Sequence, residues 1–390
     1  MCFRNAYARP MIRRMTAQSI VDRPGTMAEA AATIRAHAQA GRVMRPRGGG
    51  TKLGWCPASE QPVTDLDMRG LNQIIEHNAG DFTAILEAGV TLKDAQLAFA
   101  GAGQMLALDP PLGADESATI GGIMASNDSG PLRHRYGSMR DLVIGITVVL
   151  SDGTIAKSGG RVIKNVAGYD LARLFTGSMG TLGMIARVAV RLHPLPQATA
   201  TVLGQSDDPD RMAAAVLAIA RAPVEADCFD VLWAGGHGTL LLRFAGRAAD
   251  QRARAAVHRM VGLEAVETVS DDTQLWAQQR ARQRSAEGLV IKVSARTTDL
   301  ATVLRTARAR GTIVARAGLG LFWVSMPGDF NVAALRQALA PRACTVLDGA
   351  DRVPDPWPVL EPRTRVLMQR VKDRFDPDRV FRPGVIAGGM

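Results

Sequence analysis

The pattern of apolar and polar positions changes near residue 196. Before that point, short runs rich in β-branched residues alternate with alanine-rich or mixed helical segments. Strands are predicted at 42–45, 65–68, 83–89, 141–150, 155–158 and 183–192. Helices are predicted at 26–40, 91–102 and 171–175, with threonine at the expected N-cap of the first two. Ser151-Asp-Gly153 predicts a hairpin between two of the strands.

From residue 197 to about 345, helices rich in alanine and arginine alternate with short strands. The predicted helices are 209–222, 247–261 and 299–310, and the predicted strands are 229–233, 239–244, 289–293 and 321–326. This alternation predicts an α+β sheet with helices on one side. The expected domains are an N-terminal extension (1–19), a first domain (20–196), a smaller α+β cap domain on the substrate side (197–356) and a C-terminal helix and tail (357–390) that packs on the first domain.

The net charge of +10 raises the hypothesis of nucleic-acid binding. However, the arginines alternate with alanine and acidic residues in 247–259 and 280–284, and no aromatic residues interleave with them to stack on bases. The charge therefore favours an acidic partner subunit, a membrane surface or a carboxylate substrate.

The cysteines Cys2, Cys56, Cys228 and Cys344 form no CxxC pair, and the six histidines show no metal-binding spacing. We therefore expect no metal site and a reducing, cytoplasmic compartment. No apolar run approaches the roughly 18–20 residues that span a bilayer.

The segment 1–18 carries four arginines and no acidic residue. It reads as a disordered extension, as translation from a start upstream of Met11 or Met15, or as a targeting peptide without the apolar core of a secretory signal.

Glycine-rich loops supply the main chemical signal. They are Arg47-Gly-Gly-Gly-Thr-Lys52, the segments 118–122 and 126–130, and Gly177-Ser-Met-Gly-Thr-Leu-Gly183. Glycine lets backbone amides approach a diphosphate closely. The spacing matches neither GxGxxG nor GxxxxGK[ST], so a Rossmann or P-loop site is excluded. Together, the loops predict one large anionic cofactor; Lys52 either lies near its phosphates or faces solvent.

The motifs RPRGGGTK, LDPP, ATIGG, RYGSMRD, KNVAGYDL and GSMGTLG, in this order, resemble the flavin-binding domain of the vanillyl-alcohol oxidase and p-cresol methylhydroxylase (PCMH) superfamily. Their variants resemble most closely the FAD-binding subunit of bacterial glycolate oxidase complexes. The resemblance covers residues 20–196 and the tail RFDPDRVFRPG. It implies an α+β fold with a two-lobed PCMH-type FAD-binding domain, the isoalloxazine facing the second domain, and a tail that returns to the FAD domain.

The resemblance also implies the residues that contact FAD. These are Arg47, Gly48, Gly49, Gly50, Thr51, Pro110, Pro111, Thr119, Gly121, Gly122, Ser126, Gly130, Gly180, Thr181, Gly183 and Ile185. Thr51 stands where relatives with covalent flavin carry histidine, so FAD is expected to be non-covalent. Two further departures are the absence of a histidine-rich HxGDGNxH-like segment and Arg382 in place of the asparagine of a terminal NPG.

The sequence offers no convincing catalytic base. Candidates for binding a substrate carboxylate are Arg243, Arg316 and Lys292, and Tyr169 is a candidate for a base or flavin-edge contact. The resemblance implies a glycolate-oxidising complex with a larger flavoprotein subunit and an iron–sulfur subunit, peripheral to the membrane only through such partners. The alternatives are a structural subunit with a vestigial FAD site and a self-sufficient FAD-dependent oxidoreductase acting on another alcohol or acid.

Overall fold

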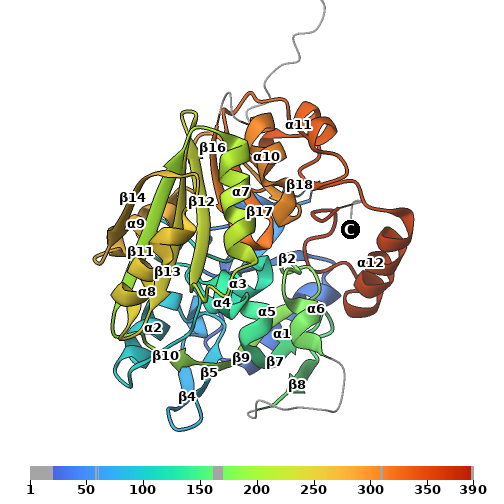
Figure 1. Ribbon diagram of the computed structural model, residues 1–390. Coiled ribbons are helices and arrows are strands. Elements are labelled where there is room, and N and C mark those ends of the chain that lie inside the picture. Colours follow the sequence, from blue (N-terminus) through green and yellow to red (C-terminus); the bar gives the residue numbers. More distant parts are fainter. Residues whose placement is uncertain (1–20, 58, 60, 161–169, 308–310, 388–390) are drawn as a thin grey trace, which may run out of the picture.

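Two lobes and a larger α+β unit form the molecule (Figure 1). The computed structural model describes residues 21–387 apart from residues 58, 60, 161–169 and 308–310. The first lobe is a parallel sheet with the order β1 (Val21–Asp22), β3 (Val63–Asp67) and β2 (Val43–Arg47). Helix α1 (Met27–Gln39) begins where the Thr26 hydroxyl accepts a hydrogen bond from the Glu29 amide, as predicted, and packs on this sheet through Ile34.

The second lobe is built on an antiparallel sheet. Its strand order is β4 (Ile74–Asn78), β5 (Thr83–Glu87), β9 (Met184–Arg191), β7 (Val143–Val149) and β8 (Ile155–Gly159). Its helices are α2 (Leu92–Ala100), α3 (Ile120–Ser126), α4 (Arg133–Tyr136), α5 (Met139–Leu142) and α6 (Leu171–Phe175). A short pair, β6 (Gln104–Met105) and β10 (His193–Pro194), lies beside it. The predicted hairpin is confirmed, because β7 pairs with β8.

One sequence expectation in this lobe needs correction. The segment 118–122 is predicted as a glycine-rich loop, but the structure starts α3 there. The hydroxyl of Thr119 accepts a hydrogen bond from the Gly122 amide, which caps the helix despite its two glycines.

The third unit contains a long antiparallel sheet. Its strand order is β14 (Glu264–Val269), β11 (Thr199–Ser206), β13 (His237–Ala245), β12 (Cys228–Ala234), β16 (Thr312–Arg316), β17 (Leu321–Met326), β15 (Leu289–Ser294) and β18 (Ala343–Val346). We call it the cap sheet. Sequence reasoning missed β11, β14, β16 and β18.

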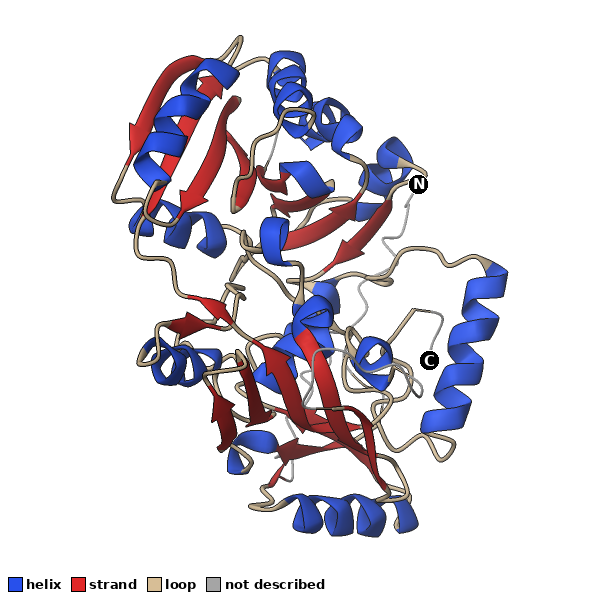
Figure 2. Ribbon diagram, turned by 60° about the horizontal axis from the view of Figure 1, so that its bottom comes forward, coloured by secondary structure: helices blue, strands red, loops and turns tan. Residues whose placement is uncertain are grey.

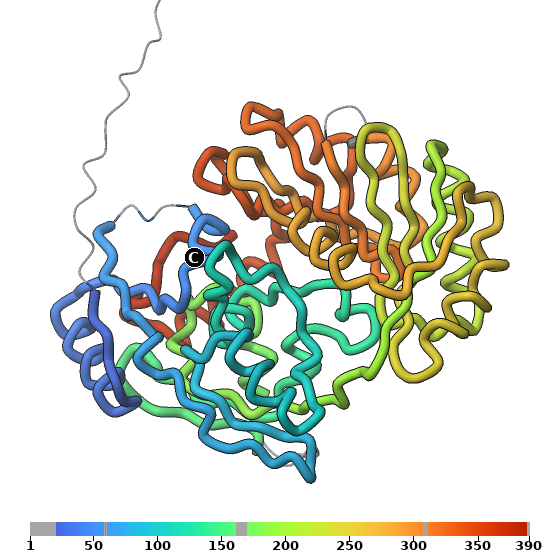
Figure 3. Tube along the Cα trace, turned by 90° about the vertical axis from the view of Figure 1, so that its left-hand side faces the viewer, coloured from blue at the N-terminus to red at the C-terminus, as the bar shows by residue number. Residues whose placement is uncertain are grey.

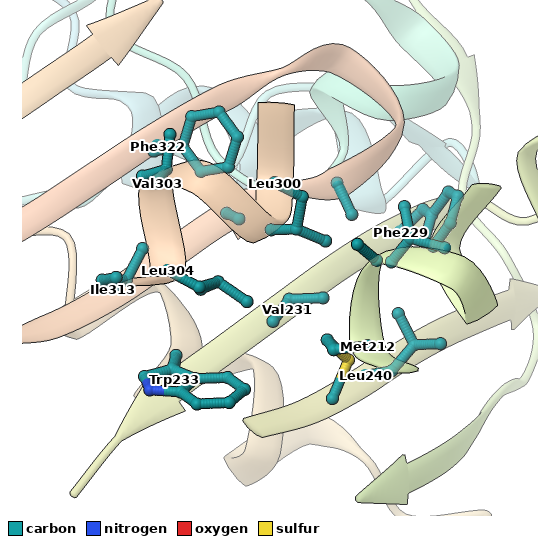
Figure 4. Packing of buried hydrophobic residues seen from close by; sticks show 14 of the residues in the cluster. Met212, Phe229, Val231, Trp233, Leu240, Leu300, Val303, Leu304, Ile313 and Phe322 are labelled. Atoms are coloured by element: carbon teal, nitrogen blue, oxygen red, sulfur yellow. The ribbon is translucent and has the colours of Figure 1, made fainter. Parts of the chain in front are cut away.

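The outer face of the cap sheet packs against α7 (Pro209–Ala220), α8 (Ala249–Ala256), α10 (Leu300–Ala307) and α11 (Val332–Leu339). Phe229, Val231 and Trp233 alternate along β12 and point into this core (Figure 4). Helix α9 (Thr273–Ala281) contradicts the prediction that all helices lie on one side. Trp276 packs on the opposite, inner face with Cys228 and Leu241, because the side chains of a strand alternate in direction at each residue.

The C-terminal segment returns to the first lobe (Figures 2 and 3). After α12 (Pro362–Phe375), the chain runs beside β2, where the Met44 amide donates to the Val380 carbonyl and the Arg382 amide donates to the Met44 carbonyl. The buried ammonium of Lys372 donates to the carbonyls of Thr181 and Phe381 and to Asp376. This lysine therefore joins α12, the tail and the loop before β9.

Candidate functional site

A groove lined by glycines lies between the two lobes. The loop that follows β2 forms one wall, and the start of α3 with Met179 forms the other. A second cavity continues past Gly180 to Ile185 and shares Pro46, Gly48, Thr119, Gly122, Ala125 and Met179 with the first. We call this continuous space the glycine groove.

Close packing explains why the loop needs glycines. A Cβ atom on Gly49 would lie 1.9 Å from the carbonyl oxygen of Ser117, and one on Gly48 would lie 2.1 Å from the Thr119 hydroxyl. Gly50 has a φ of +74°, which residues other than glycine rarely adopt. The glycines therefore allow the loop to rest against residues 117–119 with its backbone exposed to the groove.

Most predicted cofactor contacts come together here. The groove is lined by Arg47, Gly48, Gly49, Gly50, Thr51, Thr119, Gly121, Gly122, Ser126, Gly180, Gly183 and Ile185. Pro110 and Pro111 line an adjoining cavity of about 610 Å³ that shares Gly49–Thr51 with the groove.

Gly130 and Thr181 do not line the groove. A Cβ on Gly130 would meet the Asp109 carbonyl at 1.9 Å, so this glycine permits packing of one backbone segment on another. Thr181 is fully buried, its hydroxyl donates to the Ser178 carbonyl, and its own carbonyl accepts from Lys372. Both residues therefore serve packing contacts rather than the lining of the groove.

Lys52 does not face solvent. Its side chain is 8% exposed and forms an ion pair of 3.2 Å with Asp128. Its ammonium also donates to the Pro111 carbonyl at 3.3 Å. Burial lowers the pKa of Lys52, and Asp128 opposes that change. The lysine therefore joins the groove wall to the segment that follows α3.

Sequence reasoning assigned no role to Cys56, Met179 or Arg382 in this wall, yet all three line it. The only sequence signal was the departure at Arg382 from the asparagine of relatives. Nothing in the sequence singled out Cys56 or Met179, because their positions in the wall depend on how distant segments pack.

The inner face of the cap sheet carries charged side chains. Arg316 is fully buried, forms an ion pair with Asp230 and donates to Gln283, with its guanidinium 4.9 Å from the centre of the Trp323 ring. Arg243 forms an ion pair of 3.1 Å with Asp272. Both arginines that sequence suggested for a substrate carboxylate are therefore already paired with carboxylates of the protein itself. Tyr169 lies outside the described residues.

Lys292 is differently placed on that face. It pairs with Trp323 across β15 and β17, with its ammonium 5.8 Å from the centre of the indole ring. Among the described residues it forms no ion pair, and burial together with the nearby Arg133 lowers its pKa to about 8, whereas Asp128 opposes the shift. Since Asp128 also binds Lys52, Lys292 lies near the groove wall.

Asp109 is a buried carboxyl that sequence reasoning also missed. One oxygen accepts from the Leu132 amide at 3.0 Å, while the other has no hydrogen-bond partner within the described part of the chain and lies 3.8 Å from Arg280. Burial raises the pKa of Asp109 to about 6, with Arg280 acting in the opposite direction.

The raised pKa of Asp109 predicts a pH dependence of stability. Between about pH 4 and pH 6, the folded state keeps a proton on Asp109. The unfolded state, in which this carboxyl has a pKa of about 3.9, has already released it. Asp109 therefore makes the free energy of unfolding fall as pH rises through this range. Asp109→Asn should remove up to about 2–3 kcal/mol of that fall. Urea unfolding of the apoprotein at pH 4.5 and 7 measures it. The exposed Asp115→Asn is the control, and parallel pH curves for wild type and Asp109→Asn would contradict the assignment.

No helix in the described residues is long and apolar enough to cross a membrane.

Comparison with known proteins finds similarity in the part of the chain that forms the groove. Residues 18–159 match the model of the FAD binding domain. The chain is 39% identical over 181 residues to glycolate oxidase subunit GlcD of Bacillus subtilis, covering 46% of this chain and 38% of that protein. It is 34% identical over 188 residues to glycolate oxidase subunit GlcE of Escherichia coli (46% and 53%) and 37% identical over 188 residues to D-lactate dehydrogenase of Archaeoglobus fulgidus (47% and 41%). The matches span about half or less of these curated relatives.

The fold has a solved counterpart over almost its whole length. A structure of alkyldihydroxyacetonephosphate synthase superposes with a TM-score of 0.70 at 17% identity, covering 93% of this chain and 75% of that one. At that identity the likeness concerns the fold alone. The predicted α+β class and the cofactor FAD are thus confirmed. Residues 18–159 thus match the FAD binding domain, and the chain shares the fold of alkyldihydroxyacetonephosphate synthase over almost its whole length.

Proposed function

We propose that this chain is the FAD-binding subunit of a glycolate or related 2-hydroxy acid oxidase, working with partner subunits. The observation that carries the proposal is the glycine groove beside a cap-sheet face on which Lys292 has no carboxylate partner among the described residues. The similarity of residues in the FAD domain to glycolate oxidase subunits and a D-lactate dehydrogenase supports the substrate class.

The groove fits the cofactor in shape and charge. Its loop presents backbone amides without side chains, and the Nε of Arg47 is buried there without a hydrogen-bond partner among the residues that the structure describes. An anion in the groove would satisfy this donor. In the proposal, Arg47–Thr51 hold the diphosphate, and Gly180, Gly183 and Ile185 contact the adenosine half. Thr51 offers no ring nitrogen for covalent attachment, so the flavin is held non-covalently.

Lys292 is the proposed contact for the substrate carboxylate. A cation without a partner carboxylate on a largely buried surface favours an anionic ligand, because pairing offsets the cost of burying charge. FAD, when bound, supplies the chemistry that accepts a hydride from the hydroxyl-bearing carbon. The protein's contribution is to orient the acid at Lys292 and to exclude water with Trp323 and the neighbouring cap-sheet side chains.

Partners complete the proposed assembly. The sequence has no CxxC pair for an iron–sulfur cluster, so electrons would leave through another subunit or a quinone. We propose a larger flavoprotein subunit and an iron–sulfur subunit, with the chain located in the cytoplasm and peripheral to the membrane only through them.

The test begins with the visible spectrum of the purified chain after FAD is added. Acid precipitation should move the flavin wholly into the supernatant. Anaerobic mixing with glycolate or D-lactate should then bleach the flavin only when partner subunits are present. Bleaching by the chain alone would favour a self-sufficient enzyme instead. A protein that stays colourless would support a structural subunit with a vestigial site and overturn the proposal.

Lys292→Met should slow flavin reduction in the assembled complex about a hundredfold at low substrate concentration, since truncating a buried charged contact costs about 2–5 kcal/mol. FAD affinity should not change. The exposed Lys157→Met is the matched control. Anaerobic stopped-flow kinetics over a range of acid concentrations measure the effect. Equal rates for the two variants would remove Lys292 from the substrate site.

A further inference from the structure

Arg382 is a buried cation in the wall of the glycine groove. It is 7% exposed and lines the groove together with the loop Gly48–Gly50. Its side chain hydrogen-bonds to Cys56, and no carboxylate pairs with it among the described residues. Asp65 is near, but that carboxylate already binds Arg45 and Arg47, at 2.6 and 3.1 Å.

The charges around the groove do not balance. Arg45 and Arg47 share the single carboxylate of Asp65, which leaves one positive charge in excess. Lys52 is neutralised by Asp128. Arg382 adds a second positive charge that no described carboxylate pairs with, and burial with Arg45 nearby lowers its pKa. The excess matches the charge of a dinucleotide diphosphate, which is about −2.

The tail holds Arg382 rigidly in this place. Its amide donates to the Met44 carbonyl on β2, directly before the glycine loop. The preceding Phe381 is fixed by Asp376, whose carboxylate accepts from the amides of Val380 and Phe381. Lys372 anchors the same turn from α12. The guanidinium is thus delivered to the groove by an ordered backbone.

The backbone at Arg382 is strained for an arginine. Its φ is +41°, a left-handed region in which asparagine and glycine are favoured. An arginine kept at such a position points to a contribution from its side chain that offsets the strain.

We propose that Arg382 binds the FAD diphosphate, so that the tail 376–382 supplies the charge that retains the cofactor. The proposal rests on FAD as the cofactor and not on which acid is oxidised. It differs from the loop contacts because it assigns retention to a residue more than three hundred positions after the glycine loop.

Arg382→Asn tests the proposal, because asparagine suits the backbone but removes the charge. The variant apoprotein should melt at the same temperature as wild type or higher, while its Kd for FAD rises about tenfold, as expected for one charge-assisted contact. Flavin fluorescence titration of the apoprotein measures the Kd. The wild-type Kd should also rise more steeply with KCl than that of the variant.

Arg379→Asn is the matched control. It makes the same change at a left-handed position in the same tail (φ +56°), but Arg379 pairs with Asp373 and does not line the groove. If the two variants bind FAD equally well, Arg382 has no role in retention. Should Arg382→Asn fail to fold, Arg382→Lys keeps the charge and must hold FAD more tightly than Arg382→Gln; equal affinities would overturn the proposal. If the protein oxidised none of the acids tested, the proposed function would fail, but the FAD affinities of these variants would still test the role of Arg382.

Discussion

Gly49→Ala is expected to weaken FAD binding about a hundredfold, so that the flavin is lost during gel filtration. The new Cβ would lie 1.9 Å from the Ser117 carbonyl oxygen and 2.6 Å from its carbon, so the loop and residues 117–119 must separate. A backbone shift of this kind costs about 2–3 kcal/mol, which corresponds to a loss of affinity of about a hundredfold. A side chain at Gly49 therefore disturbs the wall of the groove at residues 117–119.

Gly54→Ala provides the control in the same region. Gly54 lies in the short 3₁₀ helix after the loop (Leu53–Trp55) and has no positive φ, and a Cβ atom added to it would meet no described atom within 4 Å. It should bind FAD as wild type does. Gel filtration followed by absorbance at the flavin band compares the two proteins. A yellow Gly49→Ala protein would show that the loop tolerates the shift and that the groove assignment is mistaken.

Lys372→Met should cause the largest loss of stability, about 3–5 kcal/mol. The lysine is 2% exposed, and its ammonium satisfies Asp376 together with the carbonyls of Thr181 and Phe381. Its removal leaves a buried carboxylate uncompensated and two carbonyls without this donor. Urea unfolding followed by circular dichroism gives the change in the free energy of unfolding.

A second variant separates charge from packing. Lys372→Met/Asp376→Asn removes both charges and should recover part of the loss, because the remaining amide can still accept from the Val380 or Phe381 backbone. A double variant as unstable as the single one would mean that the carbonyl contacts, and not the ion pair, hold the tail.

Local signals in the sequence predicted much of the first two lobes. Thr26 and Thr91 cap the helices where they were expected, and α6 begins and ends at the predicted residues, Leu171 and Phe175. Capping side chains and hairpin turns act over a few residues, so they are readable without the rest of the fold. The same holds for α7, which begins at Pro209, the predicted first residue, with Asp208 as its N-cap.

The cap sheet was harder to predict because its strands carry mixed signals. β16 includes the buried Arg316 and β14 is mostly exposed, so neither reads as an apolar alternation. The second face of the sheet and α9 could not be foreseen from local patterns, since Trp276 finds its partners through the folding of distant segments.

The sequence likewise predicted only part of the candidate site. The glycine loops were visible because close backbone approach demands glycine at Gly48 and Gly49. Lys292, Asp109 and Arg382 gave little signal, because a charged residue becomes informative only when its burial and the absence or presence of partners are known. Arginine is so frequent in this chain that sequence alone cannot separate Arg382 from those on the surface.

The position of Arg382 also bears on the order of events during synthesis. The loop that follows β2 leaves the ribosome long before the tail, and the whole cap sheet is made in between. Until residues 376–382 dock beside β2, the groove lacks the part of its lining that Arg382 provides. If Arg382 binds the FAD diphosphate as proposed, a nascent chain can retain the flavin firmly only after translation has passed Arg382 and residues 376–382 have docked beside β2.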